Sequence, residues 1–363
     1  MTTQVDTVVL GGGIAGLCVA RRLAQSGDRV VLVEKRQIGA GASGAAAGLQ
    51  EVAWNPKSDF QRRMAASYAG YPAFVAELVE ETGREVELSR TGSLHVAADV
   101  DAESRLKKRF ERLHQDGAPV RWLEPDAIES LLGQGAGDIR SGLLNEEARR
   151  VHPPDLLRAL RQSLVSHDVE ILEDVHDIRI LDGQETPRVN LVPNEREPRE
   201  ICSTRVVVCA GAWTTELLAA AGIEPEAEVV PIRGQMVQID ASDLPTFEWV
   251  LHLDDHYVIP RPGRSLLVGA TVEDVGFDER VTADGIEELL SVARKIFPQI
   301  NCEAVQCAQF GLRPKLLRRG GALVTCGRIS VLAGHYRNGI LAAPRDADHL
   351  VKGLTGTSAS HYW

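Results

Sequence analysis

Apolar runs and amphipathic stretches follow one another along this 363-residue chain in the order typical of an α/β fold. Residues 5–10 are a β-branched run of the kind found in buried parallel strands. From Ile14 to about Ser26 the apolar positions recur with helical spacing, and Gly27 ends the segment. A second apolar run covers 29–33. The N-terminal pattern therefore predicts a strand, a helix and a second, parallel strand.

Further along, the pattern indicates two kinds of strand and several charged amphipathic helices. Helices are expected over 60–82, 103–116 and 153–167, and strands that return to the first sheet near 169–172 and 206–209. Strands of a different, antiparallel sheet are expected over 235–239, 257–260 and 265–270, and a surface hairpin over the polar stretch 184–200. The chain is therefore expected to leave and re-enter its first domain.

Composition narrows the classes of partner. With 44% hydrophobic residues the chain can bury a large core, and a net charge of −11 argues against a broad surface for nucleic acid or an anionic membrane. No apolar stretch is long enough to span a membrane, and we expect no signal peptide. The six cysteines form no CxxC pair and no histidine lies in a metal or nucleophile motif, so we expect a cytoplasmic protein without a metal site.

The strand–helix–strand unit carries a dinucleotide fingerprint. Gly11, Gly13 and Gly16 satisfy GxGxxG, in which the glycines permit a tight turn, close approach of a pyrophosphate and close helix–strand packing. Glu34 follows 18 residues after Gly16, where its carboxylate can accept hydrogen bonds from both ribose hydroxyls. A lone GxGxxG is a weak signal, but the complete unit is specific. An acid at this position makes NADP the least expected dinucleotide.

The next segment favours FAD over NAD. Residues 39–49 hold four glycines, five alanines and one serine, so they present almost no side-chain bulk. A flexible linker is the alternative, but linkers of this kind are richer in polar residues and rarely carry three alanines in a row. We therefore expect a large flat group to lie against this backbone.

Motifs along nearly the whole chain resemble the D-amino-acid oxidase superfamily of FAD enzymes, and within it the bacterial glycine oxidases of thiamin biosynthesis. They occur in the family's order, and their combination is far more specific than any one of them. They are GGGIAG at 11–16, GASGAAAG at 41–48, VVVCAGAWT at 206–214, PIRGQM at 231–236, YVIPR at 257–261, FGLRP at 310–314 and GHYRNGI at 334–340.

The resemblance implies an α/β fold in which a Rossmann-type FAD-binding domain is interleaved with an α+β substrate domain containing an antiparallel sheet. The expected parts are 1–82, 148–228 and 309–363 for the FAD-binding domain, and 83–147 and 229–308 for the substrate-binding domain. The residues that the resemblance places at FAD are Gly11, Gly13, Ile14, Ala15, Gly16, Glu34, Lys35, Ala42, Ser43, Ala46, Ala47, Gly48, Leu49, Val175, Ala210, Gly211, His335, Tyr336, Arg337, Asn338, Gly339, Ile340 and Leu341.

Three side chains are candidates for the chemistry. Arg313 and Arg337 lie in otherwise apolar motifs, where a guanidinium binds either a substrate carboxylate or an internal acid. By resemblance Arg313 is the carboxylate ligand, while for Arg337 both uses stay open. Tyr257 is an ordinary amphipathic strand residue by pattern, but the resemblance places its hydroxyl on the same carboxylate.

Two other features have a structural and a functional interpretation. His335 adjoins the flavin motif and is expected to be a structural neighbour of the site. Asp254 and Asp255 are expected in a solvated loop, with contact to a substrate amine as the alternative.

The activity implied is oxidative deamination of glycine, sarcosine or a small D-amino acid by hydride transfer to FAD, with dioxygen as acceptor and hydrogen peroxide as product. An FAD dehydrogenase that passes electrons to a quinone or a partner protein, an amine oxidase with a larger substrate, and an inactive flavin-binding protein are the alternatives. A homo-oligomer, dimer or tetramer, is expected by resemblance. The chain departs from the family at 315–327 and 345–363, and it has Leu49 and Val272 where Met is frequent, so the substrate stays open.

Overall fold

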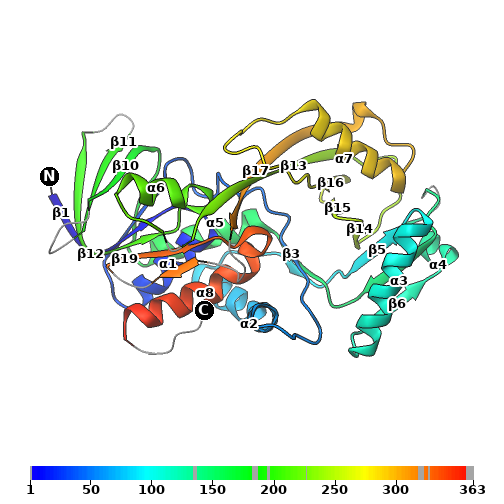
Figure 1. Ribbon diagram of the computed structural model, residues 1–363, viewed down its shortest axis with the longest axis horizontal. Coiled ribbons are helices and arrows are strands. Elements are labelled where there is room, and N and C mark those ends of the chain that lie inside the picture. Colours follow the sequence, from blue (N-terminus) through cyan, green and yellow to red (C-terminus); the bar gives the residue numbers. More distant parts are fainter. Residues whose placement is uncertain are drawn as a thin grey trace.

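The computed structural model describes residues 2–133, 137–181, 187–193, 197–225, 227–317, 323–325 and 328–356. The molecule is elongated, with one eight-stranded sheet near each end (Figure 1). We call the end that holds the N-terminal strand the first lobe, and helices and strands alternate through it. The opposite end, the second lobe, contains a mostly antiparallel sheet. This is the α/β architecture that the sequence predicts.

The centre of the first sheet is parallel and buried on both faces. β1 (Thr2–Leu10) lies between β12 (Arg199–Val208) and β2 (Val30–Val33), with β9 (Glu170–Leu172) beyond β2 and β19 (Ile329–Ala333) beside β12. The β-branched runs predicted from the sequence supply these strands, and their side chains belong to two apolar clusters, one on each face.

An antiparallel extension of this sheet corrects one expectation. The stretch 184–200 is not a surface hairpin along its described length, because β11 (Arg188–Pro193) pairs with both β10 (Val175–Leu181) and β12. Val189 and Leu191 on β11 are fully buried. The polar residues around them hide this short alternating pattern in the sequence. In the divergent segment 315–327, β18 (Leu323–Thr325) pairs with β19, and residues 318–322, 326 and 327 lie outside the described residues.

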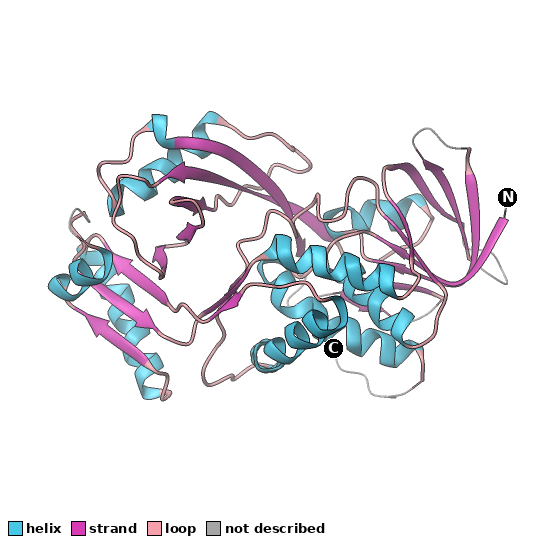
Figure 2. Ribbon diagram, turned by 180° about the vertical axis from the view of Figure 1, so that it is seen from behind, coloured by secondary structure: helices cyan, strands magenta, loops and turns pink. Residues whose placement is uncertain are grey.

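Four helices pack together beside the first sheet (Figure 2). They are α1 (Ile14–Gln25), α2 (Asp59–Thr82), α5 (Pro153–Ser166) and α8 (Gly339–Leu354). A shorter helix, α6 (Thr214–Ala220), lies near β10 and β13. Helix α8 begins within the GHYRNGI motif and continues into the divergent segment as far as Leu354.

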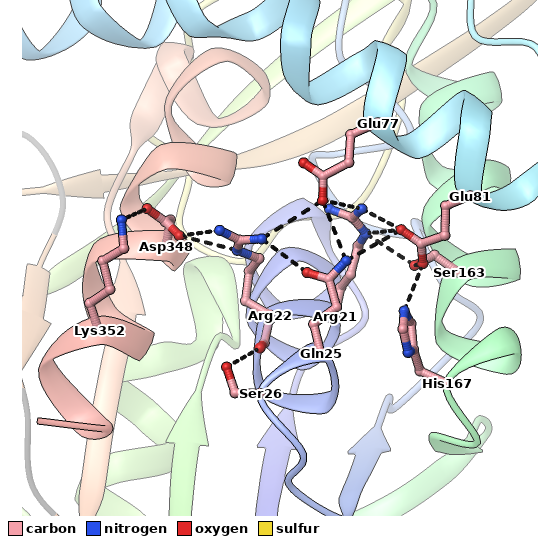
Figure 3. Close-up of polar contacts among 10 residues, drawn as sticks. All are labelled: Arg21, Arg22, Gln25, Ser26, Glu77, Glu81, Ser163, His167, Asp348 and Lys352. Atoms are coloured by element: carbon pink, nitrogen blue, oxygen red, sulfur yellow. Dashed lines mark hydrogen bonds and ion pairs between the residues drawn. The ribbon is translucent and has the colours of Figure 1, made fainter. Parts of the chain in front are cut away.

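A buried arginine joins three of these helices (Figure 3). Arg21 on α1 is 1% exposed, and it forms ion pairs with Glu77 and Glu81 of α2 and a hydrogen bond with Ser163 of α5. Burial alone would raise the pKa of Glu81, but the hydrogen bonds from Arg21 and Ser163 lower it below its usual value. The charge is therefore buried together with its counter-ions, which is the arrangement that a buried ion requires.

The second sheet is built from eight strands in the order β17-β13-β16-β15-β14-β5-β7-β6. Their bounds are Val305–Leu316, Val229–Asp240, Ser265–Gly269, His256–Arg261, Val250–Leu253, Ser93–Ala97, Ser141–Asn145 and Val120–Leu123. The pairs are antiparallel except β14 with β5. β17 runs across the expected domain boundary at 309 and stays in this sheet throughout.

The two faces of the second sheet differ in character. Val258 and Val268 point to one face, where they pack in an apolar cluster with α4 (Pro125–Leu132) and α7 (Ala283–Ile296). Since side chains alternate along a strand, Tyr257 and Arg313 point to the other face. Helix α3 (Val100–Gln115) packs against the β5–β7–β6 end.

A small third sheet lies between the two large ones (Figure 1). It consists of β3 (Leu49–Gln50), β8 (Arg149–Val151) and β4 (Leu88–Ser89), with β8 in the middle. The chain crosses between the lobes here, so residues just after β3 come from the first lobe and reach the second. None of the helices in the described ranges is long and apolar enough to cross a membrane.

Candidate active site

A cavity of about 730 Å³ opens at the carboxyl ends of the parallel strands of the first sheet. Leu10, Val33 and Ala333 end three of these strands and line it, as do the first residues of α1 and α8. This is where open α/β sheets bind ligands, and the volume suits an organic cofactor.

Most of the residues predicted to bind a cofactor line this cavity. They are Gly11, Gly13, Ile14, Ala15, Glu34, Lys35, Ala42, Ser43, Ala46, Ala210, Gly211, His335, Tyr336, Arg337, Gly339 and Ile340. The structure places seven others outside the lining: Gly16, Ala47, Gly48, Leu49, Val175, Asn338 and Leu341.

Packing explains several of these exceptions. A Cβ at Gly16 would lie 1.9 Å from the carbonyl oxygen of Gly11, so this glycine serves helix–strand contact. Val175 and Leu341 belong to apolar clusters of the first lobe. Ala47 and Leu49 pack against the second sheet beside Tyr257.

Gly11, the first glycine of the fingerprint, makes the sharp turn between β1 and α1. Gly11 has φ +115°, and a Cβ there would lie 2.4 Å from the carbonyl oxygen of Cys209. Only glycine meets both conditions, so the chain turns sharply into α1, whose first residues line the cavity.

Both helices that begin at the cavity suit a negatively charged ligand. At the N-terminus of α1 and of α8 the N-cap residue makes no side-chain hydrogen bond to the helix, and no acid lies in the first turn. Ser43 accepts a hydrogen bond from the Ile14 N–H at 3.0 Å, which ties the small-residue segment to the start of α1. The positive ends of two helix dipoles therefore face the same space.

Glu34 is fixed at the end of β2. Its carboxylate accepts hydrogen bonds from the backbone N–H of Gly12 at 2.6 Å and of Arg36 at 2.8 Å. The side chain is thereby oriented along the cavity wall, as the fingerprint requires of an acid that binds ribose hydroxyls.

The match to a known family decides what this site is. Residues 6–352 match the family described as DAO, FAD dependent oxidoreductase. The chain belongs to the DAO family. FAD is its cofactor.

Named relatives of this DAO-family chain are glycine oxidases. The glycine oxidase of Pseudomonas aeruginosa is 31% identical over 358 residues, which cover 96% of this chain and 94% of that protein. The glycine oxidase of Geobacillus kaustophilus is 30% identical over 352 residues, covering 95% and 91%. The crystal structure of glycine oxidase from Bacillus cereus superimposes with a TM-score of 0.85 at 25% identity, covering 98% of this chain and 96% of that one.

The second sheet brings Arg313 and Tyr257 together on one face. The Arg313 guanidinium lies over Gly234 of β13, where a Cβ would be 2.2 Å from Nη2, and its Nη1 donates to the carbonyl of Thr271 at 2.9 Å. The Tyr257 ring lies over Gly269 of β16, where a Cβ would be 2.6 Å from the hydroxyl oxygen. Two glycines therefore give these two side chains their positions.

Burial sets the protonation of this pair. It raises the pKa of Tyr257 to about 12, although the charges of Arg313, Arg261 and Arg337 oppose the rise. It lowers the pKa of Arg313 below its usual value. At neutral pH the phenol therefore keeps a proton to donate, and a guanidinium keeps its charge.

The structure also places the residues whose use the sequence left open. Arg337 is at the rim, 45% exposed, and its nearest approach to an acid among the described residues is 4.0 Å to Asp255. Asp255 is 87% exposed, as expected for a solvated loop. His335 is buried, and its Nε2 lies 3.1 Å from the carboxylate of Asp346.

Sequence reasoning missed part of the cavity rim. Arg36 lies over the ring of Trp213 at 5.4 Å and forms an ion pair with Glu279, and the Trp213 and Phe277 rings are 5.8 Å apart. These residues come from three segments distant in sequence. No motif links them, so only the folded chain shows that they share a wall.

It also missed a polar cluster on the second sheet. Glu51, His95 and His252 hold their ligand atoms within 4.8 Å of one another. Burial would raise the pKa of Glu51, but the neighbouring His95, His252 and Ser93 hold it well below its usual range. Burial, with repulsion by His95, lowers the pKa of His252 to about 3. His95 and His252 lie far apart in the sequence and share no motif. They become adjacent only because β5 pairs with β14.

Proposed function

We propose that this chain is an oxidase of a small amino acid or amine, with glycine, sarcosine or a small D-amino acid as substrate. The observation that carries the proposal is the meeting of Arg313 and Tyr257 on the sheet face that packs against Ala45, Ala47 and Leu49 of the small-residue segment. The relatives named glycine oxidase support this substrate class.

The cofactor residues have distinct tasks in this proposal. Glu34 would hold the adenosine ribose, the N-terminus of α1 the pyrophosphate, and the N-terminus of α8, next to Arg337, the pyrimidine side of the flavin. Bound FAD supplies the hydride acceptor and afterwards delivers the electrons to dioxygen, giving hydrogen peroxide.

The chain's own residues would then mainly orient the substrate. Arg313 would bind the substrate carboxylate through its fork of N–H donors, and the Tyr257 hydroxyl would donate to the other oxygen. Orientation of this kind can lower a barrier by roughly 7–11 kcal/mol. The substrate reacts as the neutral amine, and no nucleophile is required. The imine product hydrolyses to an oxoacid and ammonia.

A direct test separates an oxidase from a dehydrogenase. The flavin-loaded protein is mixed with glycine, sarcosine or D-alanine under nitrogen and then exposed to air. We expect loss of the oxidised flavin absorbance, followed by its return in air with stoichiometric peroxide. Reduced flavin that persists in air, and is reoxidised only by a quinone, would contradict the oxidase assignment.

Replacement of Arg313 tests the carboxylate site. We expect Arg313→Ala to lower kcat/KM about 100-fold, because at least two charge-assisted hydrogen bonds to the substrate are lost. Arg313→Lys keeps the positive charge but lacks the paired N–H donors of a guanidinium. Its kcat/KM should lie between those of the wild type and Arg313→Ala. The control is Arg140→Ala, which removes a surface ion pair with Glu103. Unchanged turnover of every amino acid in Arg313→Ala would refute the assignment.

A further inference from the structure

The catalytic face of the second sheet carries a continuous row of polar side chains. Its members, Tyr257, His252 and His95, are directly paired across β15, β14 and β5. Directly paired residues project to the same face, so this row begins at the substrate side and extends toward α3. Neighbouring strands are about 5 Å apart, which places His95 two strand spacings from Tyr257.

Glu51 covers the far part of this row. It follows β3, and its Oε1 lies 3.4 Å from Nε2 of His95 and 3.7 Å from Nε2 of His252. Ser93 donates a hydrogen bond to the same oxygen. The Glu51 side chain is 23% exposed and the His252 side chain 17%, so the cluster is enclosed and only partly reached by solvent.

The hydrogen bonds within the Glu51–His95–His252 cluster leave room for one further hydrogen-bond donor from a ligand. Arg109 donates to Nδ1 of His95 at 3.0 Å, so Nε2 of His95 carries the proton and points it at Glu51. Oε2 of Glu51 has only a long contact of 3.4 Å with Arg109. Nε2 of His252 is buried and has no hydrogen-bond partner. Among the described residues, the His252 nitrogen is therefore unsatisfied, and one carboxylate oxygen of Glu51 is only weakly bonded.

The charges are arranged along the row. Arg109 comes from α3, at the β5–β7–β6 end of the sheet, and contacts His95 and Glu51. His252 pairs with Tyr257 and is the member nearest to it. Along this row His252 lies nearest to Tyr257, and the Arg109 guanidinium lies at the opposite end.

The ring geometry disfavours a metal ion in this arrangement. The rings of His95 and His252 are stacked, 4.3 Å apart and only 12° from parallel. An imidazole binds a metal along a lone pair in its own ring plane, and two parallel planes share no such point. The Nε2 proton of His95 is a further obstacle, because a ligating nitrogen must be free.

We propose that Glu51 and His252 form a subsite for a hydrogen-bond-donating, positively charged group at the far end of the substrate. This inference rests on the proposed function, because it takes the substrate carboxylate to lie at Arg313 and Tyr257. Among small amino acids, those with a second ammonium group are then preferred over glycine. Oxidation takes place at the carbon next to the carboxylate, and the second amine is only bound.

The test uses matched pairs of ligands on the flavin-loaded protein under nitrogen. 2,4-Diaminobutanoate is compared with its isostere norvaline, and ornithine with norleucine, each in D and L form. The flavin spectrum reports two events: a perturbation of the oxidised bands gives Kd, and bleaching gives the rate of reduction. We expect the better diamino acid to bind at least about tenfold more tightly than its isostere, the effect of one charge-assisted hydrogen bond.

Variants assign that preference to the cluster. Glu51→Gln should reduce the ratio of the two Kd values to within about threefold, and glutamate should gain affinity in it. Glu170→Gln, which removes a carboxylate paired with Arg199 on the first sheet, should keep the wild-type ratio. His252→Phe is the second variant, for use if the circular dichroism of Glu51→Gln shows that it does not fold.

The outcomes separate this inference from the proposed function. No preference for the diamino acid in the wild type, or a preference that survives in both variants, overturns the subsite. Zinc binding at micromolar concentration that Glu51→Gln abolishes would assign the cluster to a metal and also overturn it. A diamino-acid preference in Kd without bleaching by any amine supports the subsite and contradicts the proposed oxidase function.

Discussion

At the scale of single residues, two glycines account for the placement of the two main site side chains. Arg313 and Tyr257 are identifiable in the sequence by resemblance, because FGLRP and YVIPR are distinctive. Their closeness is not, since they lie on β17 and β15, which are separated by β13 and β16. Gly234 and Gly269 on those two strands leave room for the guanidinium and the ring to lie flat on the sheet.

Gly234→Ala should displace Arg313. A Cβ would lie 2.2–2.4 Å from three atoms of the guanidinium, so the side chain must move. Because a shift of about 1 Å in a positioning group can cost about 100-fold, we expect kcat/KM to fall by that order. Gly70→Ala, in α2 with nothing within 4 Å of the new Cβ, is the control and should keep wild-type activity. Equal activity in the two variants would show that Arg313 is not held by Gly234.

His252 should make the protein sensitive to acid. Its pKa is about 3 in the folded chain and about 6.5 when unfolded, so below pH 6.5 the unfolded state takes up a proton that the folded state does not. Stability is therefore unaffected above pH 6.5 and falls as the pH decreases toward 3. The groups that face His252 are Glu51, His95 and Arg109 beyond them.

Urea unfolding at pH 7.5 and pH 5.5 measures this effect. At pH 5.5 the lowered pKa of His252 reduces the free energy of unfolding by about 1.4 kcal/mol. His252→Asn should lose stability less steeply between these pH values by about that amount. Glu51 titrates below this window and does not interfere. The same pH dependence in wild type and variant would contradict the buried, neutral imidazole.

At the scale of elements, the apolar pattern predicts most strands and helices within a few residues. The run 29–33 became β2 (Val30–Val33), and 153–167 became α5 (Pro153–Ser166). The pattern fails where tertiary contact decides. Among the side chains of β11 that the structure describes, two apolar ones are fully buried, Val189 and Leu191, and they lie within a polar stretch. Arg21 looks like a solvent-facing helix residue, yet α2 and α5 bury it.

Arg21→Met tests how much the helix junction depends on its ion pairs. We expect the free energy of unfolding to fall by about 3 kcal/mol, because Glu81 keeps a partly buried charge without its main partner. The double variant with Glu81→Gln should recover a large part of the loss. Arg22→Ala, whose side chain is 36% exposed, should cost less than about 1 kcal/mol. Urea unfolding of the four proteins is the measurement, and equal losses for Arg21→Met and Arg22→Ala would be the contrary result.

At the scale of the whole molecule, the site is assembled from two lobes that the chain enters repeatedly. The cavity is formed by the first lobe together with Leu312, Pro314 and Glu279 of segments belonging to the second. Most residues that the sequence predicts for the cofactor half line the cavity, because they lie in contiguous motifs. The substrate half depends on strand order in the second sheet, and composition and spacing do not specify that order.

In the proposed function, Arg313 and Tyr257 orient a carboxylate-bearing amine for oxidation by FAD. The most direct measurement is anaerobic bleaching of the flavin by glycine and by methylamine, which lacks the carboxylate. We predict bleaching by glycine, or by a larger amino acid of the same kind, at least about 100-fold faster than by the matching amine. Equal rates for the acid and the amine, or no bleaching by any amino acid, would contradict it.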